Sequence, residues 1–201
     1  MRFRPTIVVP AAGRGSRFGG VLHKLEQPFE GGTVLTCTVR RAIQSQLPVV
    51  VVTTAARAPG LASLLATRDV VVLSEADAAL GMGASIAAGV AERSGAPGWL
   101  VLPGDMPLVH PDSILAVASA LEQHPVVYAQ YRGRRGHPVA FAAELYSELI
   151  QLRGDEGARR VMARYPAHGQ EVDDPGVLMD VDTAADLQAA RKASGQVQPA
   201  D

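Results

Sequence analysis

A glycine-rich segment follows the first strongly apolar run of the chain, and its residue types suit an anionic ligand. Residues 11–20 read Ala-Ala-Gly-Arg-Gly-Ser-Arg-Phe-Gly-Gly, and Lys24 follows. Glycine lacks a Cβ atom, so backbone N–H groups in such a loop can approach an anion closely. The cationic side chains of Arg14, Arg17 and Lys24 could neutralise a triphosphate. The segment 11–24 therefore predicts a nucleotide phosphate loop, although an ordinary turn with solvated arginines would use the same residues.

Two familiar phosphate motifs do not fit this loop. A P-loop requires lysine directly after its last glycine, whereas three residues separate Lys24 from Gly20. A dinucleotide fingerprint requires a third glycine where this chain has Phe18, and an acidic residue at the end of the second strand. Arg57 follows that strand instead and could meet a 2′-phosphate. A nucleoside triphosphate is thus the favoured ligand, with an NADP-dependent oxidoreductase as an alternative.

Asp105 is the first residue that could hold a metal. It follows the apolar run 99–102, in the segment Gly-Asp-Met-Pro-Leu. An aspartate at the carboxyl end of a central parallel strand would face the same crevice as the glycine loop. Mg²⁺ is usually bound by one or two carboxylates together with substrate phosphates. A plain turn is the alternative, because Gly-Asp and Met-Pro both favour turns.

The second metal-binding carboxylate is expected near the end of the chain. Asp180 and Asp182 would point to the same side if a short strand runs through both. Asp182 could instead cap a final helix, with Asp186 in its first turn. We predict that Asp105 and Asp182 bind Mg²⁺, with Asp180 as the alternative to Asp182.

Two further segments could contact substrates. Gly81 and Gly83 would let the backbone pass close to a planar base, and Ser85 offers a hydroxyl group, although the same pattern is typical of a helix N-terminus. Arg135 and His137 lie in an arginine-rich segment that could bind an anionic second substrate. A solvated turn is the alternative for that segment.

The elements that must position these residues alternate between strand and helix. Uninterrupted β-branched runs predict strands that are covered on both faces, and the stretches between them have helical patterns. Such alternation predicts a parallel sheet with helices on both sides. The expected strands are 6–9, 48–54, 70–73 and 99–102, and the expected helices are 34–46, 83–93 and 112–123.

The later part of the chain predicts a different arrangement. Strands over 126–132 and 138–141, joined by a turn at 133–136, should form a hairpin. Expected after them are helices over 143–152 and 156–165, a short strand over 177–181 and a last helix over 183–193. We expect one domain over 1–193 and a flexible tail over 194–201, which is polar and contains Gly195 and Pro199.

Composition excludes several classes of protein. Of 201 residues, 47% are apolar, which indicates a globular fold with a full core. The 19 lysines and arginines nearly balance the 20 acidic residues, unlike the basic surface of a nucleic-acid-coating protein. Cys37 is the only cysteine, so no intrachain disulfide forms. The first apolar run is too short for a signal peptide or a membrane span, and we expect a cytoplasmic protein.

The motifs resemble those of a known family. The loop Ala-Ala-Gly-x-Gly-x-Arg-x-Gly with a following lysine is similar to the signature of the MobA-like nucleotidyltransferases. Further segments, in the expected order between about residues 7 and 187, resemble its molybdenum cofactor cytidylyltransferase branch. They are Gly-Met-Gly-Ala-Ser at 81–85, Gly-Asp-Met-Pro-Leu-Val at 104–109, Gly-His-Pro-Val-Ala-Phe at 136–141, Gly-Asp-Glu-Gly-Ala-Arg at 154–159 and Asp-Val-Asp-Thr at 180–183.

The resemblance implies a Rossmann-like three-layer α/β/α fold, mostly parallel, with a small β-hairpin insertion. It implies a Mg²⁺-dependent enzyme that moves CMP from CTP to the terminal phosphate of molybdopterin cofactor and releases pyrophosphate, with a molybdenum hydroxylase apoenzyme as a further partner. The implied catalytic residues are Lys24, Asp105 and Arg17, and the implied acceptor-binding residues are His137 and Arg135. The implied nucleotide-binding residues are Ala11, Ala12, Gly13, Arg14, Gly15, Ser16, Arg17, Lys24, Gly81, Gly83, Ser85 and Asp105.

Two departures from the family pattern leave alternatives open. Pro10 stands where an aliphatic residue is usual, and Met106 stands where many cytidylyltransferases have glutamine. Methionine is also common at that position among guanylyltransferases. A guanylyl- or sugar-phosphate nucleotidyltransferase would share the first loop and Asp105. A non-catalytic cofactor-insertion chaperone would bind nucleotide without turnover.

Overall fold

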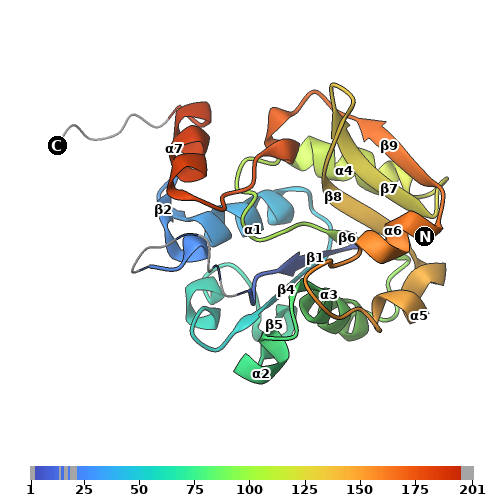
Figure 1. Ribbon diagram of the computed structural model, residues 1–201, viewed down its shortest axis with the longest axis horizontal. Coiled ribbons are helices and arrows are strands. Elements are labelled where there is room, and N and C mark those ends of the chain that lie inside the picture. Colours follow the sequence, from blue (N-terminus) through green and yellow to red (C-terminus); the bar gives the residue numbers. More distant parts are fainter. Residues whose placement is uncertain (1–2, 14, 16–17, 19–21, 196–201) are drawn as a thin grey trace.

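A seven-stranded sheet runs through the centre of the protein (Figure 1). The computed structural model describes residues 3–13, 15, 18 and 22–195. The strand order is β5-β4-β1-β6-β8-β7-β9, in which β8 runs antiparallel to both of its neighbours and the other pairs are parallel. The strands are β1 (Thr6–Pro10), β4 (Val49–Thr54), β5 (Val70–Leu73), β6 (Gly98–Val101), β7 (Val126–Tyr131), β8 (Arg134–Ala142) and β9 (Ala167–Glu171).

The central strands are covered on both faces. Every residue of β1 and β4 is buried, as their uninterrupted β-branched runs predict. Side chains alternate between two cores, since Ile7 and Val9 pack in one apolar cluster and Val8 packs in the other. The four strands expected in the first half of the chain are confirmed within one or two residues at each end.

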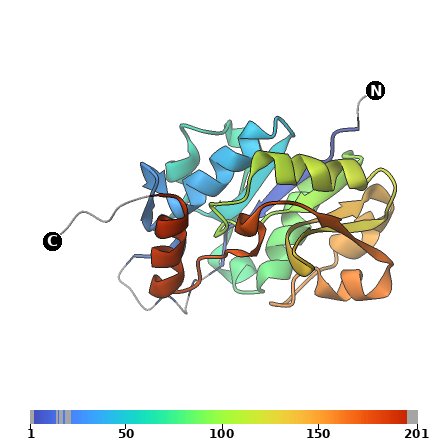
Figure 2. The same ribbon diagram turned by 90° about the horizontal axis from the view of Figure 1, so that it is seen from above.

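Helices form a layer on each face of the sheet (Figure 2). The first layer contains α1 (Val34–Gln44) and α4 (Pro111–Ala120), and α7 (Ala184–Ala193) contributes to the same core. The second contains α3 (Met82–Glu92), α5 (Tyr146–Leu149) and α6 (Arg159–Arg164). This arrangement confirms the three-layer α/β/α fold. None of the helices in the described ranges is long and apolar enough to cross a lipid bilayer.

Short elements connect these layers. A separate two-stranded antiparallel sheet pairs β2 (Pro28–Phe29) with β3 (Gly32–Thr33), and it is the small hairpin outside the central sheet. The remaining helices are α2 (Glu75–Ala78) and the 3-10 turns η1 (Lys24–Glu26), η2 (Ala58–Leu61), η3 (Thr67–Asp69), η4 (Ala143–Leu145) and η5 (Pro175–Leu178).

The second half of the chain departs from the sequence expectations in several places. The predicted hairpin exists as β7 and β8, but it belongs to the central sheet and its turn is the shorter Arg132–Gly133. The strand expected over 177–181 is wrong. Pro175 cannot donate to a ladder, and the Asp174 side chain accepts the Gly176 N–H, so this segment forms η5 instead.

Other departures concern the ends of elements. The helix expected over 143–152 splits into η4 and α5, and the one expected over 156–165 shortens to α6. The edge strand β9 lacks a run of apolar residues and gave no strand signal. The last helix is capped by Thr183, through a capping box with Asp186, and not by Asp182. The tail expectation for 196–201 falls outside the described residues.

Candidate active site

Two cavities adjoin at the carboxyl ends of the central strands. The first has a volume of about 440 Å³ and the second about 570 Å³. Both have Lys24, Met82, Pro103, Asp105, Asp155 and Asp182 in their walls. The first cavity extends to the glycine loop, and the second extends to the start of β8 and the segment before α6. A molecule in one cavity would therefore meet a molecule in the other at these shared residues.

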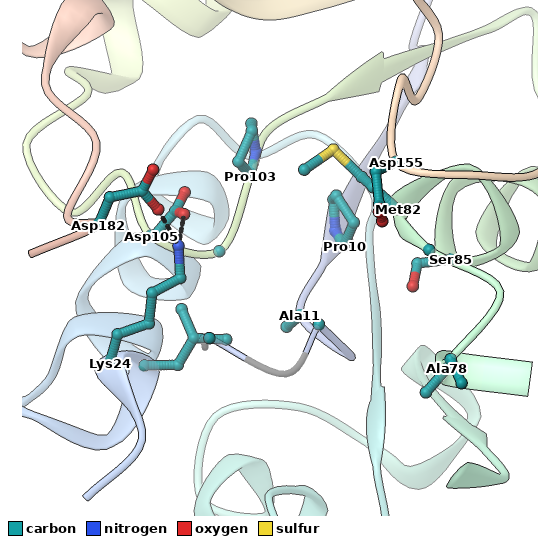
Figure 3. Close-up of a pocket in the computed structure, with 16 residues that line it drawn as sticks. Pro10, Ala11, Lys24, Ala78, Met82, Ser85, Pro103, Asp105, Asp155 and Asp182 are labelled. Carbon is teal, nitrogen blue, oxygen red and sulfur yellow. Dashed lines mark hydrogen bonds and ion pairs between the residues drawn. The ribbon is translucent and has the colours of Figure 1, made fainter. Parts of the chain in front are cut away.

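Lys24 and two aspartates form a charged cluster in the shared wall (Figure 3). The Lys24 Nζ atom lies 2.5 Å from Asp105 Oδ2 and 2.5 Å from Asp182 Oδ1. These side chains are only 14%, 13% and 18% exposed. Burial by itself would lower the pKa of Lys24, but the charges of Asp105 and Asp182 and their hydrogen bonds raise it above its usual value. Lys24 is therefore a fixed positive charge at the point where the cavities meet.

The sheet and two loop contacts bring the aspartates together. The parallel pairing of β1 and β6 continues beyond β6, where Gly104 N donates to Pro10 O at 3.1 Å. This contact puts Asp105 beside the start of the glycine loop. Val181 N donates to the backbone oxygen of Asp105 at 2.9 Å, which brings the next residue, Asp182, alongside.

The donor atoms of this cluster fit a hard divalent cation. The Asp105 Oδ1 atom is buried and has no hydrogen-bond partner in the described part of the chain, while Oδ2 and Asp182 Oδ1 converge on one ammonium group. Carboxylate oxygens are the protein ligands that Mg²⁺ and Mn²⁺ prefer. Among the described residues, His, Cys, Asp and Glu form no group of three or more that could hold a metal. Two carboxylates would thus bind such an ion together with substrate oxygens.

The glycine loop forms the floor of the first cavity. Ala11, Gly13 and Gly15 line it, whereas Ala12 is buried beside it. Gly15 has a φ of 61°, and a Cβ atom there would lie 2.6 Å from the His23 Nε2 atom. The loop can therefore take this path only with glycine at position 15. Arg14, Ser16 and Arg17, which the sequence assigns to the nucleotide, lie outside the described residues.

Side chains from two other segments hold the carbonyl groups of this loop. Arg57 donates to Ala11 O at 3.1 Å and to Gly13 O at 3.3 Å, so it braces the loop. The Nδ1 atom of His23 accepts from Leu25 N, and its Nε2 atom donates to Gly13 O at 2.9 Å. Burial and the charge of Arg57 lower the pKa of His23, which favours this neutral tautomer.

The opposite wall of the first cavity is the start of α3. Met82, Ser85 and Asp155 face the lysine–aspartate cluster across the cavity (Figure 3). Gly81 also lines it, with a φ of 90° and a ψ of -179°, and a Cβ atom there would lie 2.5 Å from the Gly154 carbonyl carbon. Gly83 lies outside the lining and packs against the backbone of Arg153. The two glycines thus let α3 approach the segment before α6.

The second cavity combines apolar side chains with charged side chains of both signs. Arg134 and Arg135 line it and are exposed, and the Arg135 guanidinium lies over the Tyr128 ring, 4.2 Å from its centroid. His137 also lines it, and its buried Nδ1 atom has no hydrogen-bond partner among the described residues. Burial is the main cause that lowers the pKa of His137, so the ring is neutral at neutral pH. The apolar lining comes from Met82, Ile86, Val101, Met106, Val139, Met162, Val177 and Leu178.

Several lining residues have no individual signal in the sequence. Asp155 and Met82 belong to both cavities, and Arg134 and Arg159 add charge to the second. Asp180, which the sequence did single out as an alternative metal ligand, lines the second cavity only. Asp155 lies in a Gly-Asp-Glu-Gly segment whose acidic residues are equally typical of a helix start. Its position between the cavities arises from the contact between that segment and Gly81, which no local pattern predicts.

Comparison with known proteins agrees with this geometry. Residues 7–171 match the family described as the MobA-like NTP transferase domain. The purine catabolism protein PucB of Bacillus subtilis is 29% identical, over 91% of this chain and 94% of its own length. The molybdenum cofactor cytidylyltransferase of Escherichia coli is 25% identical, over 92% of this chain and 94% of its own.

A solved structure shares the fold over nearly its whole length. Rv0371c from Mycobacterium tuberculosis, in a complex with manganese, has a TM-score of 0.77 and 26% identity, covering 94% of this chain and 99% of that one. The family match spans the glycine loop, Lys24 and Asp105, whereas Asp182 of the shared wall follows the matched residues. This chain belongs to the MobA-like NTP transferase family and is a nucleotidyltransferase of that family.

Proposed function

We propose that the protein transfers CMP from CTP to the terminal phosphate of molybdopterin cofactor and releases pyrophosphate. The observation that carries this proposal is the pair of cavities that meet at Lys24, Asp105 and Asp182. Transfer between two substrates needs both reacting phosphates at one charged point, with the rest of each molecule held apart. The likeness to the E. coli cytidylyltransferase supports this choice of donor and acceptor.

In the proposed reaction the triphosphate occupies the first cavity. The backbone of residues 11–19 and the charges of Arg14, Arg17 and Lys24 hold its phosphates, and the wall at Gly81 and Ser85 borders the base. We propose that Asp105 and Asp182 bind Mg²⁺, which when bound would supply positive charge beside the α-phosphate and the leaving pyrophosphate.

The acceptor occupies the second cavity in this proposal. Its apolar side chains suit a flat heterocyclic ring system, and Arg135 with its neighbours suits an anionic group. An oxygen of the acceptor phosphate attacks the α-phosphorus, forming one P–O bond while the bond to the β-phosphate oxygen breaks. The acceptor oxygen is already ionised, so Lys24 needs only to neutralise charge, and no residue is required as a general base.

A second candidate function is supported by the relative PucB, which is named for a pathway and not for a reaction. We propose as the alternative that the protein delivers the cofactor to a molybdenum hydroxylase apoenzyme without turnover. The two candidates differ in the fate of the nucleotide. Transfer consumes it, whereas delivery leaves it intact.

The test is turnover by the purified protein with molybdenum cofactor, Mg²⁺ and each nucleoside triphosphate in turn. We expect pyrophosphate release with CTP and a cytidine dinucleotide product in the mass spectrum. Preference for GTP would instead indicate a guanylyltransferase, as Met106 allows. Activity only with sugar phosphates would mean that the acceptor is a sugar phosphate and not molybdenum cofactor. Tight nucleotide and cofactor binding without pyrophosphate would favour the delivery role.

A further inference from the structure

A buried carboxylate lies outside the lining of both cavities. Asp174 is 5% exposed, and its two oxygens accept three hydrogen bonds of 2.8 Å each. The Oδ2 atom accepts from His110 N and Ser113 Oγ, and the Oδ1 atom accepts from Gly176 N. A carboxylate with three short, well-made hydrogen bonds is held firmly in one orientation.

These hydrogen bonds join the two segments that carry the metal-binding aspartates. His110 and Ser113 belong to the stretch that leads from Asp105 into α4, and Gly176 belongs to the stretch that leads to Asp182. The segments are joined a second time, close to the cluster, where Val181 N donates to the backbone oxygen of Asp105. Together these contacts restrict the movement of one segment relative to the other.

Close packing makes this region sensitive to small displacements. A Cβ atom at Gly176 would lie 2.3 Å from Leu108 O, and one at Gly136 would lie 2.2 Å from Val177 O. The segment around η5 is therefore wedged between the loop after β6 and the start of β8. In addition, the His110 side chain does not cap α4, and the Asp174 carboxylate adds a negative group at that helix N-terminus, where Asp112 already lies in the first turn.

We propose that Asp174 is a positioning residue that holds Asp105 and Asp182 at the separation needed to share one divalent ion. The proposal rests on the proposed function, because that function assigns the ion to these two aspartates. Without the carboxylate, the three hydrogen bonds at Asp174 are lost, and only the packing around Gly176 and the contact at Val181 hold the segments together, so their relative position is less well fixed. Metal affinity then falls although no metal ligand is changed.

The test compares two buried serines. Ser113→Ala removes one hydrogen bond of the Asp174 carboxylate without changing any charge. Ser45→Ala is the matched control, because Ser45 is equally buried and its Oγ bonds to Ala42 O at the end of α1, away from both cavities. Asp174→Asn is the stronger change. Each protein is titrated with Mn²⁺ alone, free and bound metal being separated by electron paramagnetic resonance, and its melting temperature is recorded.

We expect Asp174→Asn to weaken Mn²⁺ binding by roughly tenfold, and Ser113→Ala to weaken it by a smaller factor. Ser45→Ala should lower the melting temperature about as much as Ser113→Ala but bind Mn²⁺ like the wild type. The inference is overturned if Ser113→Ala and well-folded Asp174→Asn bind Mn²⁺ like the wild type. The titration contains no nucleotide or acceptor. Wild-type turnover can therefore support the proposed function while the titration contradicts the role of Asp174, and the titration can support that role while turnover is absent.

Discussion

The two cavities share some of their lining residues, but the remaining lining differs in kind between them. The first is lined largely by backbone and small residues, such as Ala11, Gly13 and Gly81, whereas the second is lined by long charged and apolar side chains, such as Arg135 and Met162. Backbone groups recognise phosphates whatever the neighbouring side chains are, so the first cavity is suited to a donor common to a whole family. Side chains make up the second cavity, so under the proposed function it would be the part of the molecule that selects the acceptor.

The difference between the cavities predicts different effects for variants in the shared wall, in the first cavity and in the second cavity. A change in the shared wall should stop transfer altogether. A change confined to either cavity should raise the Michaelis constant of one substrate only. A variant that affected both Michaelis constants from one cavity would show that the cavities are not independent.

The largest effect is expected at the shared wall. Asp105→Ala removes one of the two carboxylates of the cluster, so kcat should fall by roughly 10³-fold or more with the fold intact. Pyrophosphate release in steady state measures it. Asp112→Ala, on the exposed surface of α4, is the control for an aspartate-to-alanine change. Near-normal turnover of Asp105→Ala would remove Asp105 from the mechanism.

The next effect is expected in the first cavity. Gly81→Ala and Gly133→Ala both place alanine at positive φ, 90° and 75°, but only at position 81 does the new Cβ meet backbone. We expect free energies of unfolding lowered by roughly 3 kcal/mol and about 1 kcal/mol respectively, measured in urea. Gly81→Ala should also raise the KM for CTP. Equal destabilisation of the two variants would argue against the close approach of α3 to Gly154.

A smaller effect is expected in the second cavity. Arg135→Ala should raise the KM for the acceptor about tenfold, as expected for one lost charge-assisted contact, while the KM for CTP stays the same. Arg132→Ala is the matched control, because Arg132 lies at the tip of the same hairpin outside the cavity lining. A change in the KM for CTP in Arg135→Ala would contradict the division between the cavities.

The smallest effect concerns the pH dependence of stability. Burial holds the pKa of His137 below the usual histidine value of 6.5, and the charge of Arg159 lowers it further, while the charge of Asp105 and a hydrogen bond with the Val101 backbone oppose the shift. Below pH 6.5 the unfolded chain therefore binds a proton that the folded protein does not, so acid destabilises the fold by at most about 1.4 kcal/mol per pH unit from this residue. Urea denaturation between pH 7.5 and 5 should show a shallower loss in His137→Gln than in the wild type. Parallel curves would mean that His137 titrates equally in both states.

The sequence predicts the first half of the molecule better than the second. The runs around Ile7 and Val50 are buried on both faces, and a β-branched run is a local signal that needs no partner to be recognised. The edge strand β9 and the turn η5 depend on neighbours. The former pairs with β7 in spite of its polar sequence, and the latter is set by the hydrogen bond that the Asp174 carboxylate accepts from Gly176 N. Tertiary contacts there override weak local preferences.

The sequence alone predicted the strands and helices of the first half of the chain, the place of the glycine loop after the first strand and Asp105 as a candidate metal ligand, because each has a short-range pattern. Only the tertiary structure decided that Lys24 lies between Asp105 and Asp182, partners 81 and 158 residues away in the chain. It also decided that Asp174 braces these aspartates and that a second cavity opens on the same wall. Contacts between distant positions form when the sheet and its two helical layers pack together, and the local sequence carries no trace of them.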